Sequence, residues 1–452
     1  MRAASHRPLP STDARAQAGL RLRRLAICIG VGLASAAGAQ AQSLQEVFEA
    51  AHAYDATYLA AKALDDSAVY RVAQIEALMR PSVLASASAG YNDTRPSIGA
   101  NYSGVQTGVT LSAKQPLFNP ANVASIDQAQ RSLIASHADL ESAEQDLIIR
   151  VAQAYFDVLG AQDTLATTRT SKAAISEQLA SAKRNFEVGT ATITDTREAQ
   201  ARYDLATAQE IAAENDLVTK RIALDQLVGR QNVVPKQLAV PVALPAVPGA
   251  IDEWVGRAEG GHPQVRKAQI GLEVARLEID KARAGNLPTV DAVASVSGQH
   301  GNTQGFTGTS KVGNVGLQLN YTIFAGYQIQ NRIKETLVLE DKARNDFDAA
   351  RRGVTQATRQ AYYGVQSGVA QVKALEAAES SSQLALEATQ LGYRVGVRVN
   401  LDVLNAQTQL FTTQRDLARA RYDVLVGNLK LRQAAGQLNS GDVAAVNQLL
   451  AK

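Results

Sequence analysis

The chain carries one sequence pattern twice, at a constant offset of 207 positions. Residues 186–195 recur as residues 393–402, and the same offset relates Gly229 to Gly436. A unit of this length is far longer than the repeats of solenoid proteins, which have about 20–50 residues. The offset therefore indicates a duplicated half-protein, and two equivalent halves predict a pseudo-symmetric object. Symmetry of this kind favours a ring, and a ring favours a channel.

Residues 1–41 predict a secretory signal peptide. Arginines precede an apolar run over residues 25–37, and small residues follow that run. This order of charged, apolar and small segments is typical of a signal peptide, and we expect cleavage after Ala39 or Ala41. The residues around the paired arginines do not match a twin-arginine signal, so the general secretory route is favoured.

Composition narrows the class of protein further. The only cysteine, Cys28, lies in the leader, so the mature chain is expected to have no lipid anchor, disulfide or cysteine metal site. Removing residues 1–41 takes away six arginines and one aspartate, which changes the formal net charge from +3 to −2. No later apolar stretch is long enough for a transmembrane helix. A nearly neutral chain without a basic stripe gives no expectation of nucleic-acid binding.

Hydrophobic periodicity divides the first copy, residues 42–230, into five elements. These are a helix over 43–79, strands over 82–91 and 103–118, a long helix over 120–188 and a returning helix over 193–228. Asn119-Pro120 predicts the start of the long helix, because asparagine is a good cap and proline is tolerated in the first turn. Leucines seven residues apart predict a coiled-coil seam along it.

The second copy, residues 251–440, is predicted to repeat this order. Its elements are a helix over 251–284, strands over 289–299 and 311–324, and helices over 327–395 and 400–435. The four prolines in residues 231–250 indicate an extended linker between the copies, and residues 441–452 form a C-terminal tail. The glycine-rich segment 298–308 lacks the end of a phosphate loop and is interpreted as the tip of an extracellular hairpin.

Lengths and patterns decide the fold class. Each long helix has about 69 residues and spans on the order of 100 Å, which is too long for a globular core. The strands alternate apolar and polar residues and are long enough to cross a bilayer as part of a water-filled barrel. One chain supplies only four such strands, and open edges are forbidden in lipid, so several chains must share one barrel. We therefore expect a mainly α protein with a small β part.

The chain resembles the TolC family of outer-membrane efflux and secretion proteins over about residues 43–445. The resemblance rests on the duplicated order of elements and on the two tip sequences, around residues 188–195 and 393–406. It implies a homotrimer with a twelve-stranded barrel in the outer membrane and a long α-helical tunnel through the periplasm. The requirement for several chains comes from the strands, whereas the number three comes from the family.

The resemblance also implies a gate at the periplasmic end of the tunnel. Arg398 and Tyr393 of the second copy match family positions that bind those of Asp195 and Thr194 of the first copy. A guanidinium fork suits a carboxylate and a hydroxyl, and a partly exposed link of this kind contributes about 1 kcal/mol. The alternative is that Asp195 only favours a helix N-terminus and that Arg398 is solvated.

Asp402 matches a family position that faces the tunnel entrance, where three chains would form a ring able to hold cations. The second aspartate found three residues later in some members is Asn405 here. The resemblance therefore implies half the charge and weaker cation selectivity or block. The alternative is a solvated aspartate on a helix surface.

The two hairpin tips have a structural and a functional interpretation. Gly189 and Gly396 allow a left-handed turn, which accounts for them fully as structural residues. The resemblance implies that the tips also contact a periplasmic adaptor protein. The tip residues are Val188, Gly189, Thr190, Val395, Gly396 and Val397.

Enzyme signatures are missing, and no catalytic residue, cofactor or metal site is expected. The resemblance implies a passive exit duct in the outer membrane, recruited by a periplasmic adaptor and an inner-membrane ABC or proton-driven transporter. Its cargo is expected to be protein exported by type I secretion, with small molecules as a second cargo. A duct for drug efflux alone is the alternative. A non-conducting structural or adhesive trimeric coiled coil is a more distant one.

Overall fold

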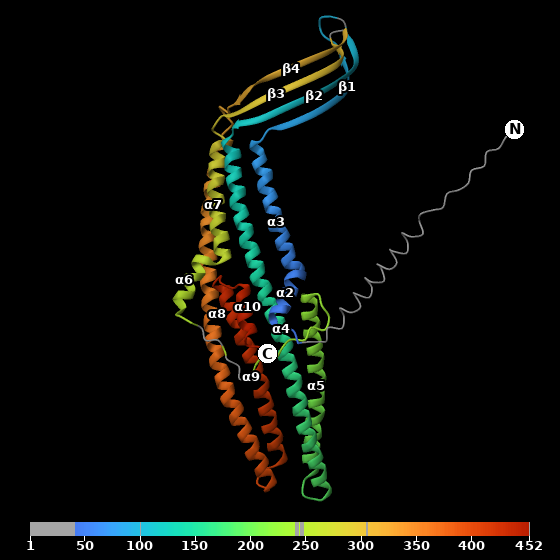
Figure 1. Ribbon diagram of the computed structural model, residues 1–452, viewed down its shortest axis with the longest axis vertical. Helices are drawn as coiled ribbons and strands as arrows, with labels where there is room; N and C mark the ends of the chain where they lie inside the picture. The colour runs from blue at the N-terminus through green and yellow to red at the C-terminus, as the bar shows by residue number, and fades with distance from the viewer. Residues whose placement is uncertain (1–40, 100, 240–243, 245–247, 304–305, 452) are drawn as a thin grey trace, which may run out of the picture.

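A computed structural model describes residues 41–451 apart from residues 100, 240–243, 245–247 and 304–305. The expected signal peptide, except Ala41, lies outside the described residues, as does part of the proline-rich linker. The molecule is elongated, with a sheet at one end and long helices running to the other (Figure 1). Among the described residues, no helix combines the length and the apolar character that crossing a membrane requires.

The elements follow the duplicated order. The first copy contains α2 (Leu44–Tyr54), α3 (Ala56–Glu76), the short η2 (Ala77–Met79), β1 (Ser82–Thr94), β2 (Tyr102–Phe118), α4 (Pro120–Glu187) and α5 (Ile193–Val228). The second contains α6 (Ile251–Gly261), α7 (Pro263–Ala284), β3 (Thr289–Thr303), β4 (Phe306–Asn320), α8 (Gln328–Arg394) and α9 (Asn400–Ala434). A last helix, α10 (Ser440–Asn447), occupies part of the C-terminal tail.

The predicted long helices are present. α4 has 68 residues and α8 has 67, each on the order of 100 Å long. Asn119 caps α4 as expected, since its side-chain oxygen accepts the N–H of Asn122 at 3.1 Å. α5 and α9 then return along them, and each begins at the predicted residue.

The prediction of one unbroken first helix in each copy is wrong. In the first copy the helix over 43–79 is interrupted at Asp55, whose side chain accepts the N–H of Tyr58 at 2.8 Å and so caps a new helix, α3. In the second copy the helix over 251–284 is interrupted at His262. Pro263 follows it in the first turn of α7, where a missing N–H is tolerated, and it disfavours a helical conformation at His262.

The predicted strand ends also need correction. β3 runs to Thr303 rather than to 299, and β4 begins at Phe306 rather than at 311, because the backbone ladder continues towards the hairpin tip. β4 ends at Asn320, not at 324. Beyond it the chain turns into α8 through Gly326 and Tyr327, whose φ angles of 57° and 63° are incompatible with a strand.

The four strands form one antiparallel sheet in the order β1-β2-β3-β4. Cross-strand partners share a face, so the registers can be compared with the sequence pattern. Leu111, Val296 and Leu317 lie on the apolar face, whereas Ser112 and Ser295 lie on the polar one. The alternation predicted from the sequence is therefore preserved across the sheet, and β1 and β4 are left as its outer strands.

The largest core lies halfway along the helices and joins both copies. It packs α4 against α2, α5, α9 and α10, with Tyr155 and Phe156 of α4 almost fully buried. The Tyr155 hydroxyl contacts two backbone oxygens, those of Gln42 at 3.0 Å and Lys236 at 3.1 Å. The C-terminal tail pairs with the linker, since the Ala451 N–H donates to the Gln237 oxygen at 2.8 Å. The core thus ties the segment that leads into α2, the linker and the C-terminal tail to one level of the molecule.

Candidate functional site

At the end opposite the sheet, the first tip joins α4 to α5 and the second tip joins α8 to α9. The two tips have the same backbone geometry. Gly189 and Gly396 adopt φ angles of 78° and 81°, in the left-handed region that glycine accepts without strain. The N–H of Thr190 donates to the Asn185 oxygen at 2.8 Å and closes the first tip. Val188, Val395 and Val397 are exposed beside the glycines. The tips therefore present apolar side chains to the outside of the chain.

The Asp195 carboxylate takes part in a local helix cap in the first tip. Its carboxylate accepts the backbone N–H of Thr192 at 2.9 Å and the Thr192 hydroxyl at 2.7 Å. The N–H of Asp195 in turn donates to the Thr192 hydroxyl oxygen at 3.2 Å. This reciprocal capping box stabilises the start of α5. The neighbouring Thr194 is exposed.

The second tip has a weaker cap at the equivalent place. Asp402 accepts the N–H of Val399 at 3.4 Å, and valine has no hydroxyl to complete a capping box. The Arg398 guanidinium lies 3.7 Å from the same carboxylate, one helical turn away. Within one chain Arg398 is therefore next to Asp402, and it is not joined to Asp195.

Tyr393 does connect the α8–α9 helical hairpin to the α4–α5 hairpin, but its partner is not the expected Asp195 or Thr194. The side-chain amide of Asn185 donates to the Tyr393 hydroxyl at 3.1 Å. Next to it, the Gln178 amide on α4 donates to Asn400, a buried residue at the start of α9. These bonds join the second half of α4 to the tips of α8 and α9.

Asn405 also joins the hairpins. Arg202 on α5 donates to the side-chain oxygen of Asn405 at 2.9 Å. An amide accepts this bond without adding a second negative charge beside Asp402, which lies on the same helix. The sequence pattern did not single out Gln178, Asn185 or Arg202, because each has its partner in the other copy and nothing in the local sequence marks it.

Farther from the tips, a buried carboxyl group links the same two helical hairpins. The Tyr422 hydroxyl on α9 donates to Asp163 on α4 at 2.6 Å. Burial raises the pKa of the Asp163 carboxyl, although the bond from Tyr422 acts in the opposite direction. Tyr422 also stacks on Phe156, with 5.7 Å between ring centroids. Beside this contact is a cavity of about 300 Å³, which Asp157, Lys220 and other residues of α4, α5 and α9 line.

Charged side chains of the tips and of the cross-hairpin contacts do not converge on a metal site. Within the described ranges, no group of three or more His, Cys, Asp or Glu side chains is arranged to hold a metal ion. What the contacts do is hold two helical hairpins together at several levels, from the core down to the tips.

Comparisons with known proteins agree with this architecture. The family model described as outer membrane efflux protein matches residues 35–230 and 254–437. The outer membrane protein TolC of Vibrio cholerae is 31% identical over 418 residues, which cover 90% of this chain and 93% of that protein. The alkaline protease secretion protein AprF of Pseudomonas aeruginosa is 31% identical over 345 residues, which cover 75% of this chain and 71% of that one.

Solved structures share the fold. The channel protein CusC superposes with a TM-score of 0.76 at 18% identity, over 88% of this chain and 92% of that one. The expected mainly α, TolC-like fold with a small sheet is therefore confirmed.

Proposed function

The chain belongs to the outer membrane efflux protein family, and from that premise we propose that it is the exit duct of a type I protein secretion system. Its place is the outer membrane, as for its relatives. The proposal adds that the helices extend through the periplasm, and that an adaptor and an inner-membrane ABC or proton-driven transporter recruit the duct. Small molecules are a second cargo, and a duct for drug efflux alone is the alternative.

One observation carries the choice of protein as cargo. Of the relatives at 31% identity, one is a protein named for the secretion of a protease. The similarity extends over three quarters of this chain. The description of the family as efflux proteins supports the alternative cargo.

The homotrimer has its own support in the single chain. Each outer strand of the sheet, β1 or β4, pairs with only one other strand among the described residues, so its outer edge is open. An open edge in lipid leaves backbone groups without hydrogen bonds, which a neighbouring chain would satisfy. Outer-membrane lipid then contacts the apolar face of the shared barrel. Nucleic acid is not among the expected partners.

The gate would form between chains. Within one chain, Arg398 has only a 3.7 Å contact with Asp402, and Asp195 keeps carboxylate lone pairs free beyond its two bonds to Thr192. We infer that Arg398 of one chain reaches Asp195 and Thr194 of its neighbour in the resting state, with Tyr393 nearby. The adaptor would then contact the exposed valines of the tips, next to these links.

Single-channel conductance in a planar bilayer tests the duct and the gate together. The wild type should show a small, resolvable conductance, and Asp195→Ala/Arg398→Ala should raise it severalfold. Because Asp195 also caps α5, Thr192→Ala serves as the matched control: it removes the hydroxyl contacts of the capping box and keeps the carboxylate. Its conductance should stay near the wild-type value. Equal conductance in all three would remove the gate and keep the duct. No conductance in any of them would favour the structural trimer.

Export assays test the cargo. A strain that lacks its own channel of this family receives the chain together with a protease-exporting transporter and its adaptor. Protease in the medium would support protein secretion. Restored drug resistance without protease export, measured with a proton-driven drug pump in place of the transporter, would favour the efflux alternative.

A further inference from the structure

Two charged side chains share the polar face of the sheet. Lys114 of β2 and Asp291 of β3 are the only residues with a formal charge on that face among the described residues of the four strands. Asp93 and Lys311, the other residues of the strands with a formal charge, lie on the apolar face by the registers of the sheet. The charge of the polar face therefore depends on one pair.

Lys114 and Asp291 form an ion pair across β2 and β3. Lys114 is in register with Val293, so Asp291 is its diagonal neighbour on the same face, two residues closer to the helices. The Lys114 Nζ lies 2.8 Å from the Asp291 Oδ2. The other carboxylate oxygen, Oδ1, is buried and has no hydrogen-bond partner among the described residues. Lys114 is therefore the cation that compensates this buried carboxylate.

The two charges of the pair differ in their access to water. The side chain of Lys114 is 55% exposed, whereas that of Asp291 is 4% exposed. An ion in water beside the polar face therefore meets the ammonium group first, and the carboxylate lies behind it. Because the interaction between charges weakens with distance, the nearer ammonium group dominates. The pair has no net formal charge, yet the side that faces water is positive.

A β-bulge marks the level of the pair in the sheet. Asp291 is in register with Pro116, and the register between β2 and β3 shifts between Pro116 and Phe118. Proline has no N–H to donate to the ladder, and in an inner strand it is found at bulges. The side-chain amide of Gln115 donates to the backbone oxygen of Met79 at 2.8 Å, which binds β2 to the end of η2. The pair is thus held where the strands continue into helices.

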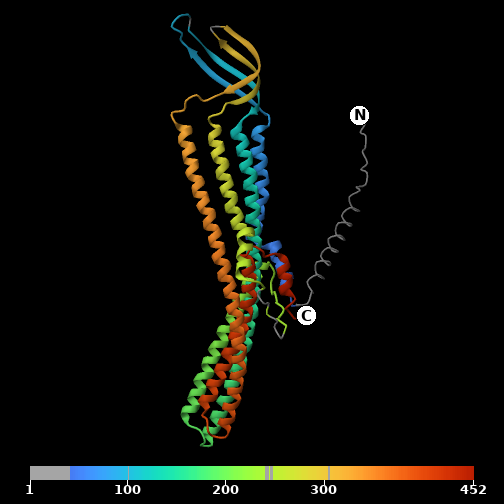
Figure 2. The same cartoon turned by 90° about the vertical axis from the view of Figure 1, so that its left-hand side faces the viewer.

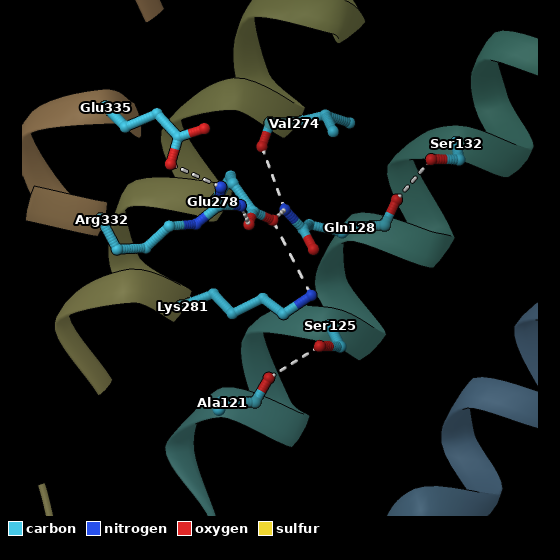
Figure 3. A network of polar contacts seen from close by, with 9 residues as sticks. All are labelled: Ala121, Ser125, Gln128, Ser132, Val274, Glu278, Lys281, Arg332 and Glu335. Carbon is cyan, nitrogen blue, oxygen red and sulfur yellow. Dashed lines mark hydrogen bonds and ion pairs between the residues drawn. The ribbon is translucent and has the colours of Figure 1, made fainter. Parts of the chain in front are cut away.

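The helices next to the pair are fixed to one another. α4 follows β2, α7 leads into β3 and α8 follows β4, and all three run from the sheet towards the opposite end (Figure 2). In Figure 3, Glu278 of α7 accepts a bond from Gln128 of α4 at 2.8 Å and one from Arg332 of α8 at 2.6 Å. Each of these residues lies within about two helical turns of the end of its helix nearer the sheet. One carboxylate thus joins the helices attached to three strands, which keeps the base of the sheet in a fixed arrangement.

We propose that this pair sets the ion selectivity at the sheet end of the channel, with Asp291 as a positioning residue that holds the Lys114 ammonium group at the water-filled face. The inference rests on the proposed assembly, in which the polar face encloses the lumen and every chain contributes one pair. The resulting ring of ammonium groups favours anions at this end. The expected Asp402 ring at the tunnel entrance has the opposite sign.

Reversal potentials of the full mature protein in a planar bilayer with a potassium chloride gradient test the proposal. All variants carry Asp195→Ala/Arg398→Ala, because a wider entrance leaves a larger share of the resistance at the sheet. Asp291→Asn removes the compensating carboxylate and should raise the chloride-to-potassium permeability ratio severalfold. Lys114→Gln leaves the carboxylate alone and should lower the ratio. Lys114→Gln/Asp291→Asn has neither charge, and its ratio should lie below that of the intact pair and above that of Lys114→Gln.

Two controls separate the effect of charge from a change in pore shape. Lys311→Gln removes a positive charge from the apolar face of the same sheet and should leave the permeability ratio unchanged. The Debye length is about 30 Å in 0.01 M salt and about 3 Å in 1 M salt, so the shifts should be large in dilute salt and nearly vanish in concentrated salt. Shifts of equal size in both would overturn the proposal, because they would report pore shape.

A swap of the two charges keeps the net charge and changes only which group faces water. Lys114→Asp/Asp291→Lys should give a lower permeability ratio than the intact pair, since a carboxylate then occupies the exposed position. The amount of each variant in outer membranes is measured first, because Lys114→Gln leaves a buried carboxylate unpaired. If that variant or the swap is absent from the membrane, Asp291→Asn and the doubly neutral variant decide the outcome.

The outcomes separate this inference from the proposed function. Permeability ratios that are the same in the intact pair, Asp291→Asn and Lys114→Gln/Asp291→Asn, in channels that conduct, would overturn the inference and leave the duct standing. Absence of conductance in every variant and in the wild type would remove the channel on which both proposals depend.

Discussion

At the scale of single residues, the buried contact between Asp163 and Tyr422 gives the sharpest expectation. Burial raises the Asp163 pKa, so the fold favours the protonated form. The contribution of this group to stability is therefore greatest below the ordinary pKa of 3.8 and is lost as pH rises through the raised pKa. Asp163→Asn has no charge to bury. Its unfolding temperature relative to wild type should increase from pH 4 to pH 8, as circular dichroism can measure.

Tyr422→Phe tests the same bond from the other side. It leaves the Asp163 carboxylate without its donor, which should cost about 1–3 kcal/mol of unfolding free energy at pH 8. The loss should be smaller below pH 3.8, where the raised pKa keeps the carboxyl protonated. An equal effect at both pH values would mean that lost packing on Phe156, not the bond, is responsible.

Asp55 should respond to pH in the opposite direction. Arg150 binds both of its carboxylate oxygens at 2.8 Å and holds the pKa of Asp55 below 3.8. This contribution is present above pH 3.8 and is lost as pH falls through the lowered pKa. Asp55→Ala removes the cap of α3 as well and should cost about 1–2 kcal/mol at pH 7. Asp55→Asn keeps the cap, so it should lose less; equal losses would assign the effect to the charge.

Residues whose partners are local were the ones that sequence reasoning described best. The cap at Asn119 depends only on its neighbours in the chain, and it was predicted. Asp195 shows the limit, since the expected gate and its alternative as a helix-terminal residue both involve one carboxylate. The structure shows the local cap, whereas a bond to another chain stays a prediction. The cross-hairpin bonds of Gln178 and Arg202 depend on a register between copies that no local pattern encodes.

At the scale of elements, the left-handed glycines that end the helices divide into two kinds. A Cβ on Gly436 would lie 2.6 Å from the Cα of His262, which is backbone and cannot move aside. A Cβ on Gly396 would meet nothing within 4 Å. Gly396→Ala should therefore cost about 1–2 kcal/mol from its φ angle alone, and Gly436→Ala clearly more. Thermal unfolding of the two variants measures the difference, and similar losses would contradict the clash.

The ends of helices and strands were predicted best where the sequence signal was strongest. α4, α5 and α9 begin where capping residues and periodicity indicated, because long regular patterns leave few alternatives. The breaks at Asp55 and His262 were missed because apolar residues continue at helical spacing on both sides of them. The end of β4 was placed too late because Tyr321 and Ile323 continue the alternation, whereas the ladder ends at the pair of Asn320 with Thr289, the first residue of β3.

At the scale of the whole molecule, the single negative charge expected per chain at the tunnel entrance has a measurable effect. Asn405→Asp would add a second carboxylate close to Asp402, three times in a trimer. Conductance should then become more cation-selective and more sensitive to block by a trivalent cation, as planar bilayers can record. Asn405→Asp keeps an acceptor for Arg202, whereas Asn405→Ala removes it; the alanine variant is the control for a change at this position that adds no charge. Equal block in all variants would mean that a charge at position 405 does not act on ions at the entrance.

The fusion of two copies in one chain, tied at mid-height by the linker and the core, changes the cost of assembly. Free molecules lose translational and rotational freedom when they associate, at an estimated 4–15 kcal/mol for each association. A ring of six half-length chains would incur that loss five times, whereas the proposed trimer of double-length chains would incur it twice. Half of the contacts around such a ring already lie within one chain when that chain folds. Duplication would therefore let the proposed ring assemble at a lower protein concentration.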